Sequence, residues 1–340
     1  MAMAMAMAMA MAMAMAMAMA MAMAMAMAMA MAMAMAMDKR MEKRIMSDKA
    51  RHKGLTGAQY HAEDKSLSNG RKDSFDSDPL LYYQYYVEKS RPVPGPSKAL
   101  TTGLILHLMI LEPDKAATDV LILPEKVLGA SGNRGTKSCA EFMEDNPAEF
   151  YVTPKEMGPL SCMVESVNKN SEAMAIIGQC DKMEYDIFWQ GADGIDRKAL
   201  CDLLSVENGV VSNLKTSRHP LDFEKSVEEF KYHRGAAWYL DAALALTGES
   251  FIHPFIVVGN QPPYYCKVWD LPPEAIVMGR CENKTIMERY RRCLESGQWG
   301  PTQDDERGTV DLTNTFYERR LRYVERIGQD PLEAVSTRRD

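Results

Sequence analysis

Three short apolar segments separated by two turn signals constrain the fold more than any other feature of the chain. The segments cover residues 182–189, 196–206 and 210–216. The stretches between them, residues 190–194 and 207–209, contain the Gly, Asp and Asn residues that tight turns between strands prefer. The pattern predicts three consecutive antiparallel strands.

Helical periodicity surrounds these strands. Residues 97–111 place apolar side chains on one helical face, with Ser97 as the N-cap and Pro113 beyond the end. Related patterns predict a helix or strand at 80–86, helices at 140–149, 154–170, 221–246 and 272–296, and a hairpin formed by 251–258 and 264–269. We expect the helices at 140–149 and 154–170 to be surface helices of an insertion, the second opening on a capping box of Thr153 and Glu156. The order of elements predicts one α/β domain over residues 75–300.

Both ends of the chain differ from this central region. Residues 1–37 are a strict Met-Ala alternation, which we interpret as a disordered segment or a translated codon repeat preceding a start near Met37, Met41 or Met46. Met and Ala are only weakly lipophilic and no basic flank precedes them, so we expect neither a membrane anchor nor a signal peptide. Residues 38–74 have little apolar periodicity and predict a charged, solvated leader, and residues 301–340 predict a polar tail.

Charge and cysteine usage exclude several classes of protein. A net charge of −7 argues against generic coating of nucleic acid, because such binding needs many Lys and Arg contacts to phosphates. None of the seven cysteines forms a C-x-x-C pair, so the sequence suggests neither a structural zinc site nor an iron–sulfur cluster. Scattered thiols of odd number predict a reducing, cytoplasmic location.

The hairpin formed by residues 196–206 and 210–216 carries the candidate chemistry. Asp202 and Asn213 are each a few residues from its turn and are expected to face one another, with Lys215 on the same face as Asn213. Such a group of side chains can hold a divalent metal for phosphodiester hydrolysis, with the lysine orienting the attacking water. An ordinary ion pair between Asp202 and Lys215 across the hairpin is the alternative.

Four motifs, taken in order, resemble the PD-(D/E)XK nucleases of the exonuclease VIII (RecE) type. They are Gly103-Leu-Ile-Leu-His107, Lys198-Ala-Leu-Cys-Asp202, Asn213-Leu-Lys215-Thr216 and Tyr232-His-Arg-Gly-Ala-Ala-Trp-Tyr239. The similarity begins near residues 67–69 and 78–80 and continues to Trp299, so it covers most of the chain after the leader. The resemblance implies a mixed sheet flanked by helices and a metal-dependent nuclease.

The resemblance also implies a role for each matching position. His107 and Asp202 would be metal ligands, and Lys215 would position the attacking water. Glu184, on the preceding strand, matches a family acidic position, although a solvent-exposed glutamate is an equal interpretation. The implied cofactor is Mg²⁺ or Mn²⁺.

Two positions depart from the family pattern. Asn213 stands where the family has an acidic residue, and Gly235 stands where a glutamine is common. An Asn oxygen can still coordinate a hard cation, so Asn213 stays a candidate catalytic residue and ligand, but the site loses one negative charge. We therefore expect a weakened or absent nuclease activity.

The implied substrate is the end of linear double-stranded DNA. Arg218 and Arg234 are the candidate phosphate contacts because they flank the motifs, and Tyr239 is a candidate DNA contact, although such an aromatic is more often part of a core. The resemblance implies 5′-to-3′ exonuclease action in phage recombination, a single-strand-annealing protein as partner and a homo-oligomeric ring. The alternatives are a catalytically weakened DNA-binding relative, and a structural or interaction protein unrelated to nucleic acid.

Overall fold

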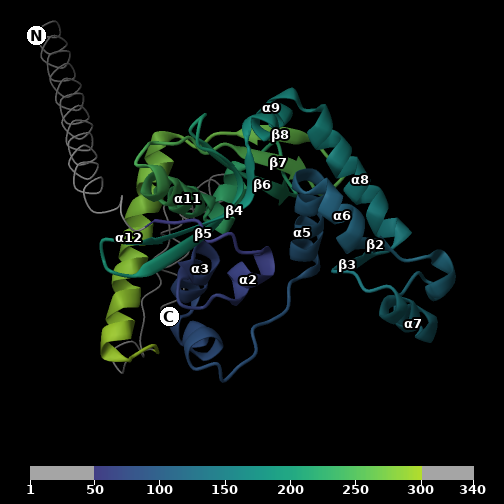
Figure 1. Ribbon diagram of the computed structural model, residues 1–340, viewed down its shortest axis with the longest axis horizontal. Helices are drawn as coiled ribbons and strands as arrows, with labels where there is room; N and C mark the ends of the chain where they lie inside the picture. The colour runs from purple at the N-terminus through teal and green to yellow at the C-terminus, as the bar shows by residue number, and fades with distance from the viewer. Residues whose placement is uncertain (1–49, 301–340) are drawn as a thin grey trace, which may run out of the picture. The chain divides into compact units, whose positions relative to one another are not determined.

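The computed structural model describes residues 50–300, and the helices and strands of this part lie in one compact unit that ends at Gln298. The Met-Ala segment, residues 38–49 of the expected leader and the expected tail at 301–340 lie outside the described residues. The helices are α2 (Gly57–Ala62), α3 (Asn69–Ser77), α4 (Pro79–Tyr82), α5 (Lys98–Leu111), α6 (Pro113–Asp119), α7 (Lys137–Asp145), α8 (Pro154–Lys169), α9 (Ser171–Gln179), α10 (Glu224–Phe230), α11 (Tyr232–Thr247) and α12 (Pro273–Ser296) (Figure 1). A π-helical turn at Tyr83–Val87 and a 3₁₀ turn at Glu125–Val127 complete them.

A mixed six-stranded sheet forms the centre of the fold, as predicted. Its order is β1-β5-β6-β7-β8, with β4 also paired to β5. The β1–β5 and β6–β7 pairs are parallel, and the β4–β5, β5–β6 and β7–β8 pairs are antiparallel. The strands are β1 (Leu67–Ser68), β4 (Lys182–Gln190), β5 (Asp196–Ser205), β6 (Val210–Ser217), β7 (Phe255–Gly259) and β8 (Cys266–Trp269), while β2 (Val120–Ile122) and β3 (Phe150–Val152) form a separate parallel pair.

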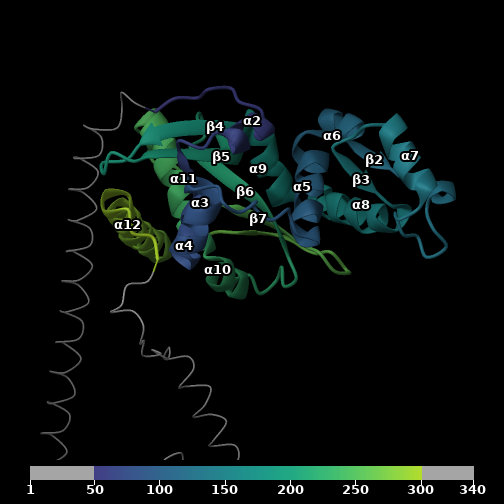
Figure 2. The ribbon, with the colours of Figure 1, turned by 90° about the horizontal axis from the view of Figure 1, so that it is seen from below.

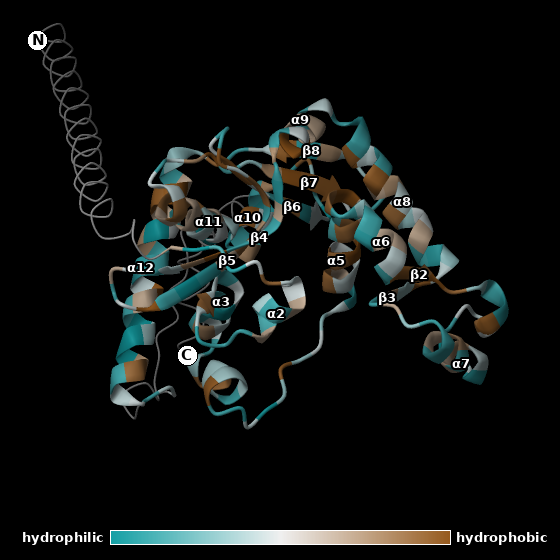
Figure 3. Cartoon of the chain, viewed as in Figure 1, coloured by the Kyte–Doolittle hydropathy of each residue, from teal (hydrophilic) through white to brown (hydrophobic). Residues whose placement is uncertain are grey.

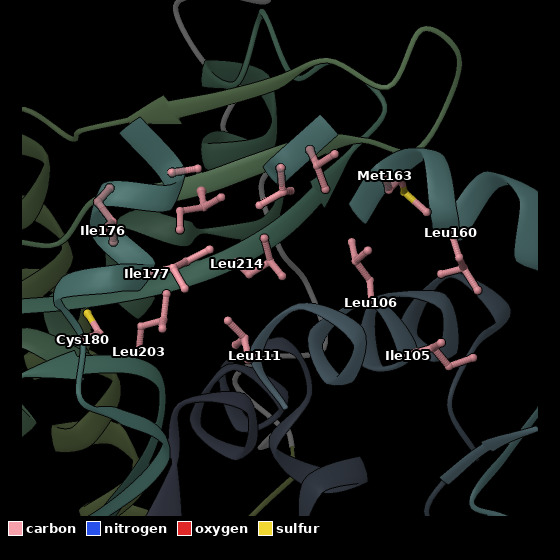
Figure 4. Packing of buried hydrophobic residues seen from close by; sticks show 14 of the residues in the cluster. Ile105, Leu106, Leu111, Leu160, Met163, Ile176, Ile177, Cys180, Leu203 and Leu214 are labelled. Carbon is pink, nitrogen blue, oxygen red and sulfur yellow. The ribbon is translucent and has the colours of Figure 1, made fainter. Parts of the chain in front are cut away.

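Helices cover both faces of the sheet. Figure 2 shows α11 and α12 on one side of the strands and α5 and α9 on the other. One extensive buried cluster joins α5, α8 and α9 to β5, β6 and β7, and includes Leu106, Met163, Ile177 and Leu214 (Figure 4). The most apolar ribbon in Figure 3 follows β7 and α5, so the hydrophobic side chains are concentrated where the sheet meets this helical layer.

Most predicted elements are confirmed, although the helix expected at 140–149 is α7 at Lys137–Asp145 and the strand expected at 251–258 begins only at Phe255. Ser97 caps α5 by accepting a hydrogen bond from the Leu100 N–H, and α12 ends at Gly297, whose φ of 70° suits a glycine. The hairpins β4–β5–β6 and β7–β8 are present. The segment at 80–86, which the pattern left open, is helical.

The prediction of a solvated leader is wrong for residues 50–74. This stretch contains α2, β1 and the start of α3, and β1 pairs with β5. The Lys72 ammonium tolerates full burial because it donates to the adjacent carboxylate of Asp73 at 2.6 Å and to Asn283, which lies far away in the sequence, at 2.7 Å. Local composition cannot show the second of these partners.

Two helical predictions also need correction. The expected helix at 221–246 is two helices, because Lys231 adopts a left-handed conformation (φ 55°) between α10 and α11. The expected surface helix at 154–170 instead contributes Leu160, Met163 and Val167 to the main core. Amphipathic periodicity shows which face of a helix is buried. It does not show where the chain changes direction between two helices, or how much of the protein packs against the buried face.

The capping box of α8 yields a stability prediction. Glu156 accepts hydrogen bonds from Thr153 and pairs with Lys98 and Arg134. Although burial would raise its pKa, the Thr153 backbone, Lys98 and Arg134 hold it at about 2, below the ordinary 4.5. We expect Glu156→Ala to lower the free energy of unfolding by about 1 kcal/mol at pH 7.

The pH dependence of this loss follows from the lowered pKa. A carboxylate with a depressed pKa contributes its stability above the unfolded value and loses it as the pH falls from about 4.5 through about 2. The difference between wild type and Glu156→Ala in urea unfolding should therefore shrink below pH 4. Lys155→Ala, which removes an exposed neighbour of Glu156, is the control; an equal loss in this variant, or a loss independent of pH, would contradict the assignment.

Candidate metal centre

The candidate site lies where β5 and β6 separate. The two strands pair only from Leu203↔Ser212 to Ser205↔Val210, and from Asn213 onward β6 pairs with β7 instead. The peptide groups of Leu214 are bound by side chains: its N–H donates to Asp202 Oδ2 at 2.9 Å, and its C=O accepts from His107 Nε2 at 2.8 Å. The gap between the strands is thus held open by two of the predicted site residues.

The hydrogen bond to the Leu214 carbonyl determines how His107 is presented. A carbonyl only accepts, so His107 carries a proton on Nε2, and Nδ1 is the nitrogen whose lone pair is free in the neutral ring. Nδ1 lies 3.8 Å from Glu184 Oε1. An imidazole oriented through its second nitrogen is the usual arrangement of a metal-binding histidine.

Glu184 completes a group of three potential ligands. Potential ligand atoms of His107, Glu184 and Asp202 all lie within 4.8 Å of one another. The neighbouring pairs Met183↔Leu203 and Tyr185↔Cys201 place Glu184 opposite Asp202 across the β4–β5 ladder. Two carboxylates and one imidazole are a donor set that suits a divalent cation, so the residues fit the metal that the motifs imply.

The backbone of Glu184 adopts an unfavourable conformation. Its φ is +46°, in the left-handed region that costs a non-glycine residue about 1–2 kcal/mol. In a regular strand the residue would pair with Asp202 through the backbone. Strain of this kind persists where surrounding structure enforces it, and here it accompanies a carboxylate that faces His107.

Opposing charges balance the buried carboxylate of Asp202. Burial alone would raise its pKa, but the His107 ring, the Lys215 ammonium and the Asn213 amide together lower it. Burial likewise would lower the pKa of His107, which Asp202 and Glu184 raise. Lys215 Nζ lies 3.9 Å and His107 Nε2 3.6 Å from Asp202 Oδ2. Asp202 is therefore ionised at neutral pH and sits between two groups that can carry positive charge.

Asn213 has a side-chain partner that the sequence did not predict. The register of β5 and β6 continues to set it opposite Asp202, as expected, but its side chain is buried and its Oδ1 accepts a hydrogen bond from His253 Nε2 at 2.8 Å. Among the His, Cys, Asp and Glu side chains of residues 50–300, Glu184 is the one that joins His107 and Asp202. No motif marked His253 in the sequence, because its contact depends on the parallel pairing of β6 with β7.

The three candidate DNA contacts have unequal access to solvent. Arg218 is exposed, and within residues 50–300 no salt bridge or hydrogen bond holds its guanidinium. The prediction for Arg234 does not fit the structure, because its guanidinium is paired with Asp76 and Glu282 inside the molecule. Tyr239 is half-buried, with its ring stacked on His253 at a centroid distance of 5.9 Å. Burial and the Asp202 carboxylate raise the pKa of the Tyr239 hydroxyl well above its ordinary value.

Gly235 faces the amide of Asn69. A Cβ added at Gly235 would lie 3.4 Å from Asn69 Nδ2, so a longer side chain at this position would displace that amide. Nothing in the structure explains why glycine stands where the resemblance suggests a glutamine.

Comparisons with known proteins agree with this fold. A family described as a PDDEXK-like domain of unknown function (DUF3799) matches residues 84–306. Among solved structures, the crystal structure of a candidate exonuclease from Eubacterium rectale matches with a TM-score of 0.53 and 12% identity, over 77% of this chain and 96% of that chain. None of the curated proteins compared with the chain matches it. The fold class predicted from the motifs is confirmed. Among residues 50–300, none of the helices combines the length and apolar character needed to cross a membrane.

The three-ligand group predicts how metal affinity responds to substitution. Glu184→Gln keeps the size of the side chain but removes one of the two carboxylate charges, so we expect Mn²⁺ affinity to fall at least about tenfold. The matched control is Glu207→Gln, an identical change in the exposed β5–β6 turn. Titration with Mn²⁺, followed by electron paramagnetic resonance of the free ion, distinguishes the variants. Equal affinity in Glu184→Gln and wild type would remove Glu184 from the site.

Proposed function

We propose that this chain is a metal-dependent deoxyribonuclease. The premise is that it belongs to the family of PDDEXK-like domains (DUF3799). The observation that carries the proposal is the convergence of His107, Glu184 and Asp202 within 4.8 Å, with Lys215 beside Asp202. These residues come from α5, β4, β5 and β6, and the first three are separated by up to 95 residues of sequence. Such a grouping is costly to bury without a function, because like charges are brought together at a strained backbone.

Each residue has a distinct task in phosphodiester hydrolysis. A Mg²⁺ or Mn²⁺ ion, when bound, lowers the pKa of a coordinated water and offsets negative charge on the phosphate. Asp202 and Glu184 supply the carboxylates, and His107 supplies Nδ1 while its Nε2–H stays on the Leu214 carbonyl. The Lys215 ammonium is placed to hold the attacking water by hydrogen bonding and to stabilise charge that develops on the phosphate.

The finer features of the proposal rest on the resemblance to exonuclease VIII. They are action on the ends of linear double-stranded DNA, 5′-to-3′ polarity, a role in phage-type recombination beside a single-strand-annealing protein, a homo-oligomeric ring and a cytoplasmic location. The exposure of Arg218, three residues beyond Lys215, supports a contact between this loop and the phosphate backbone. The net charge of −7 implies that such contacts are local.

A second candidate function is DNA binding with weakened cleavage. Asn213 favours it, because the amide supplies no charge where the family has a carboxylate. The group of three ligands weighs against it, since Glu184 and Asp202 already provide two carboxylates.

Cleavage of linear duplex DNA separates the two candidates. We expect wild type to degrade end-labelled duplex with Mg²⁺ or Mn²⁺, and Asp202→Ala and Lys215→Ala to lose at least about 100-fold in rate, since each removes a group that acts on the reacting atoms. The Glu207→Gln variant should cleave as wild type does. Wild type that binds duplex but cleaves no faster than Asp202→Ala would favour the second candidate.

Asn213→Asp tests the missing charge. A third carboxylate should bind Mg²⁺ more tightly and raise the rate at limiting Mg²⁺ by about tenfold or more. Rates are compared across a Mg²⁺ titration on the same duplex. Equal rates throughout the titration would show that the neutral amide does not weaken this enzyme.

Arg218→Ala tests the phosphate contact. Losing one contact should weaken duplex binding uniformly across sequences and reduce the slope of log K against log salt by about 1. Lys284→Ala, which removes an exposed cation on α12, serves as the control. An unchanged salt slope in Arg218→Ala would place the DNA elsewhere.

A further inference from the structure

Asn213 and His253 form a buried polar pair beside the candidate metal centre. Their residues are 1% and 6% exposed, and Asn213 Oδ1 lies 2.8 Å from His253 Nε2. The imidazole is enclosed by aromatic rings, with Tyr239 stacked on it and Phe255 in an edge contact at 4.6 Å. The position of the ring is therefore determined by packing, and only its protons can rearrange.

Each member of the pair has one polar atom left over. Among residues 50–300, Asn213 Nδ2 and His253 Nδ1 are buried without a hydrogen-bond partner. Buried polar atoms are nearly always paired, so two leftover atoms on one bonded pair need an explanation. Asn213 Nδ2 is nevertheless close enough to Asp202 for the amide to favour the carboxylate form of that residue.

A neutral imidazole can bind either end of an amide. The His253 ring is buried between Tyr239 and Phe255, and within residues 50–300 no carboxylate forms an ion pair with it, so burial favours its neutral form. With the proton on Nε2, the ring donates to the amide oxygen. With the proton on Nδ1, Nε2 accepts from the amide nitrogen. Rotation of the Asn213 amide by half a turn exchanges these two arrangements without altering the space that the side chain fills.

The charge next to the amide decides between the two arrangements. Without a cation, the Asp202 carboxylate repels an oxygen and attracts an N–H, which favours the observed arrangement in which Oδ1 is bound to His253. A divalent cation reverses this preference, because it attracts the amide oxygen. The turned amide would give Nδ2 an acceptor in His253 and direct Oδ1 toward the metal centre.

We propose that His253 is a positioning residue that holds Asn213 in either of two amide orientations, and that divalent metal selects the one in which Asn213 Oδ1 joins the site as a neutral ligand. The proposal rests on the metal centre of the proposed function. In this proposal Asn213 is not a defective acid. Its amide oxygen becomes a metal ligand when the cation binds, and His253 forms a hydrogen bond with the amide in both orientations.

The proton on His253 reports the orientation directly. In protein labelled with ¹⁵N-histidine, we expect His253 to carry its proton on Nε2 without metal and on Nδ1 at saturating Mg²⁺, seen as an exchange of the two nitrogen shifts. A proton that stays on Nε2 while Mg²⁺ binds would overturn the inference and leave the metal centre intact. Absence of any Mg²⁺ or Mn²⁺ binding by wild type would overturn both proposals.

Metal affinity of His253 variants provides the second measurement. His253→Phe fills the space but cannot accept from the turned amide, so Mn²⁺ affinity should fall about 10–100-fold, the usual effect of losing a partner of a metal ligand. His253→Gln offers both a donor and an acceptor and should restore affinity to within about threefold of wild type. His219→Phe, the same change at an exposed position, is the control. Wild-type affinity in a folded His253→Phe, or equal weakening by Phe and Gln, would exclude the positioning role.

Discussion

The separation of β5 from β6 after only three residue pairs is the constraint on which the site depends. Beyond Leu203↔Ser212, β6 pairs in parallel with β7, while β5 continues with β4 and, at its other end, with β1. The unpaired peptide of Leu214 would carry a large penalty if it were buried alone. Asp202 and His107 bind its N–H and C=O, so the same two contacts that satisfy the backbone also fix the direction of the ligands.

This arrangement links catalysis to stability. Asp202 is 8% exposed, and its carboxylate is tolerated because the Leu214 N–H, His107 and Lys215 surround it. Removal of one partner would leave a buried charge without compensation, which is more costly than the pair is favourable. The Leu214 side chain belongs to the main core beneath α5 and α9, so the metal centre is supported by hydrophobic packing on the opposite side of the strand.

The sequence predicted what is encoded locally and missed what depends on distant partners. Strand limits, the Ser97 and Thr153 caps and the Gly297 terminus follow from residue types within a few positions, and the structure contains them. The prediction that Asp202 and Asn213 lie opposite one another required only the position of the turn between their strands. By contrast, the buried Lys72 ammonium is paired with the adjacent Asp73 but donates its second hydrogen bond to Asn283, 211 residues away, so residues 50–74 had the composition of a solvated leader. The role of His253 likewise requires the sheet order, which no local pattern contains, whereas Glu184 was expected only from the family resemblance.

The charge of the site accounts for an amide at position 213. Glu184 and Asp202 together carry two negative charges, and a third carboxylate opposite Asp202 would add like-charge repulsion in a buried place whenever no cation is present. Asn213 avoids this cost, because its amide presents an N–H toward Asp202 and its oxygen is bound by neutral His253. A carboxylate at this position has no donor group with which to stabilise Asp202 in the absence of metal. The amide therefore binds the cation less tightly than a carboxylate would, but it keeps the buried charges of the metal-free protein balanced.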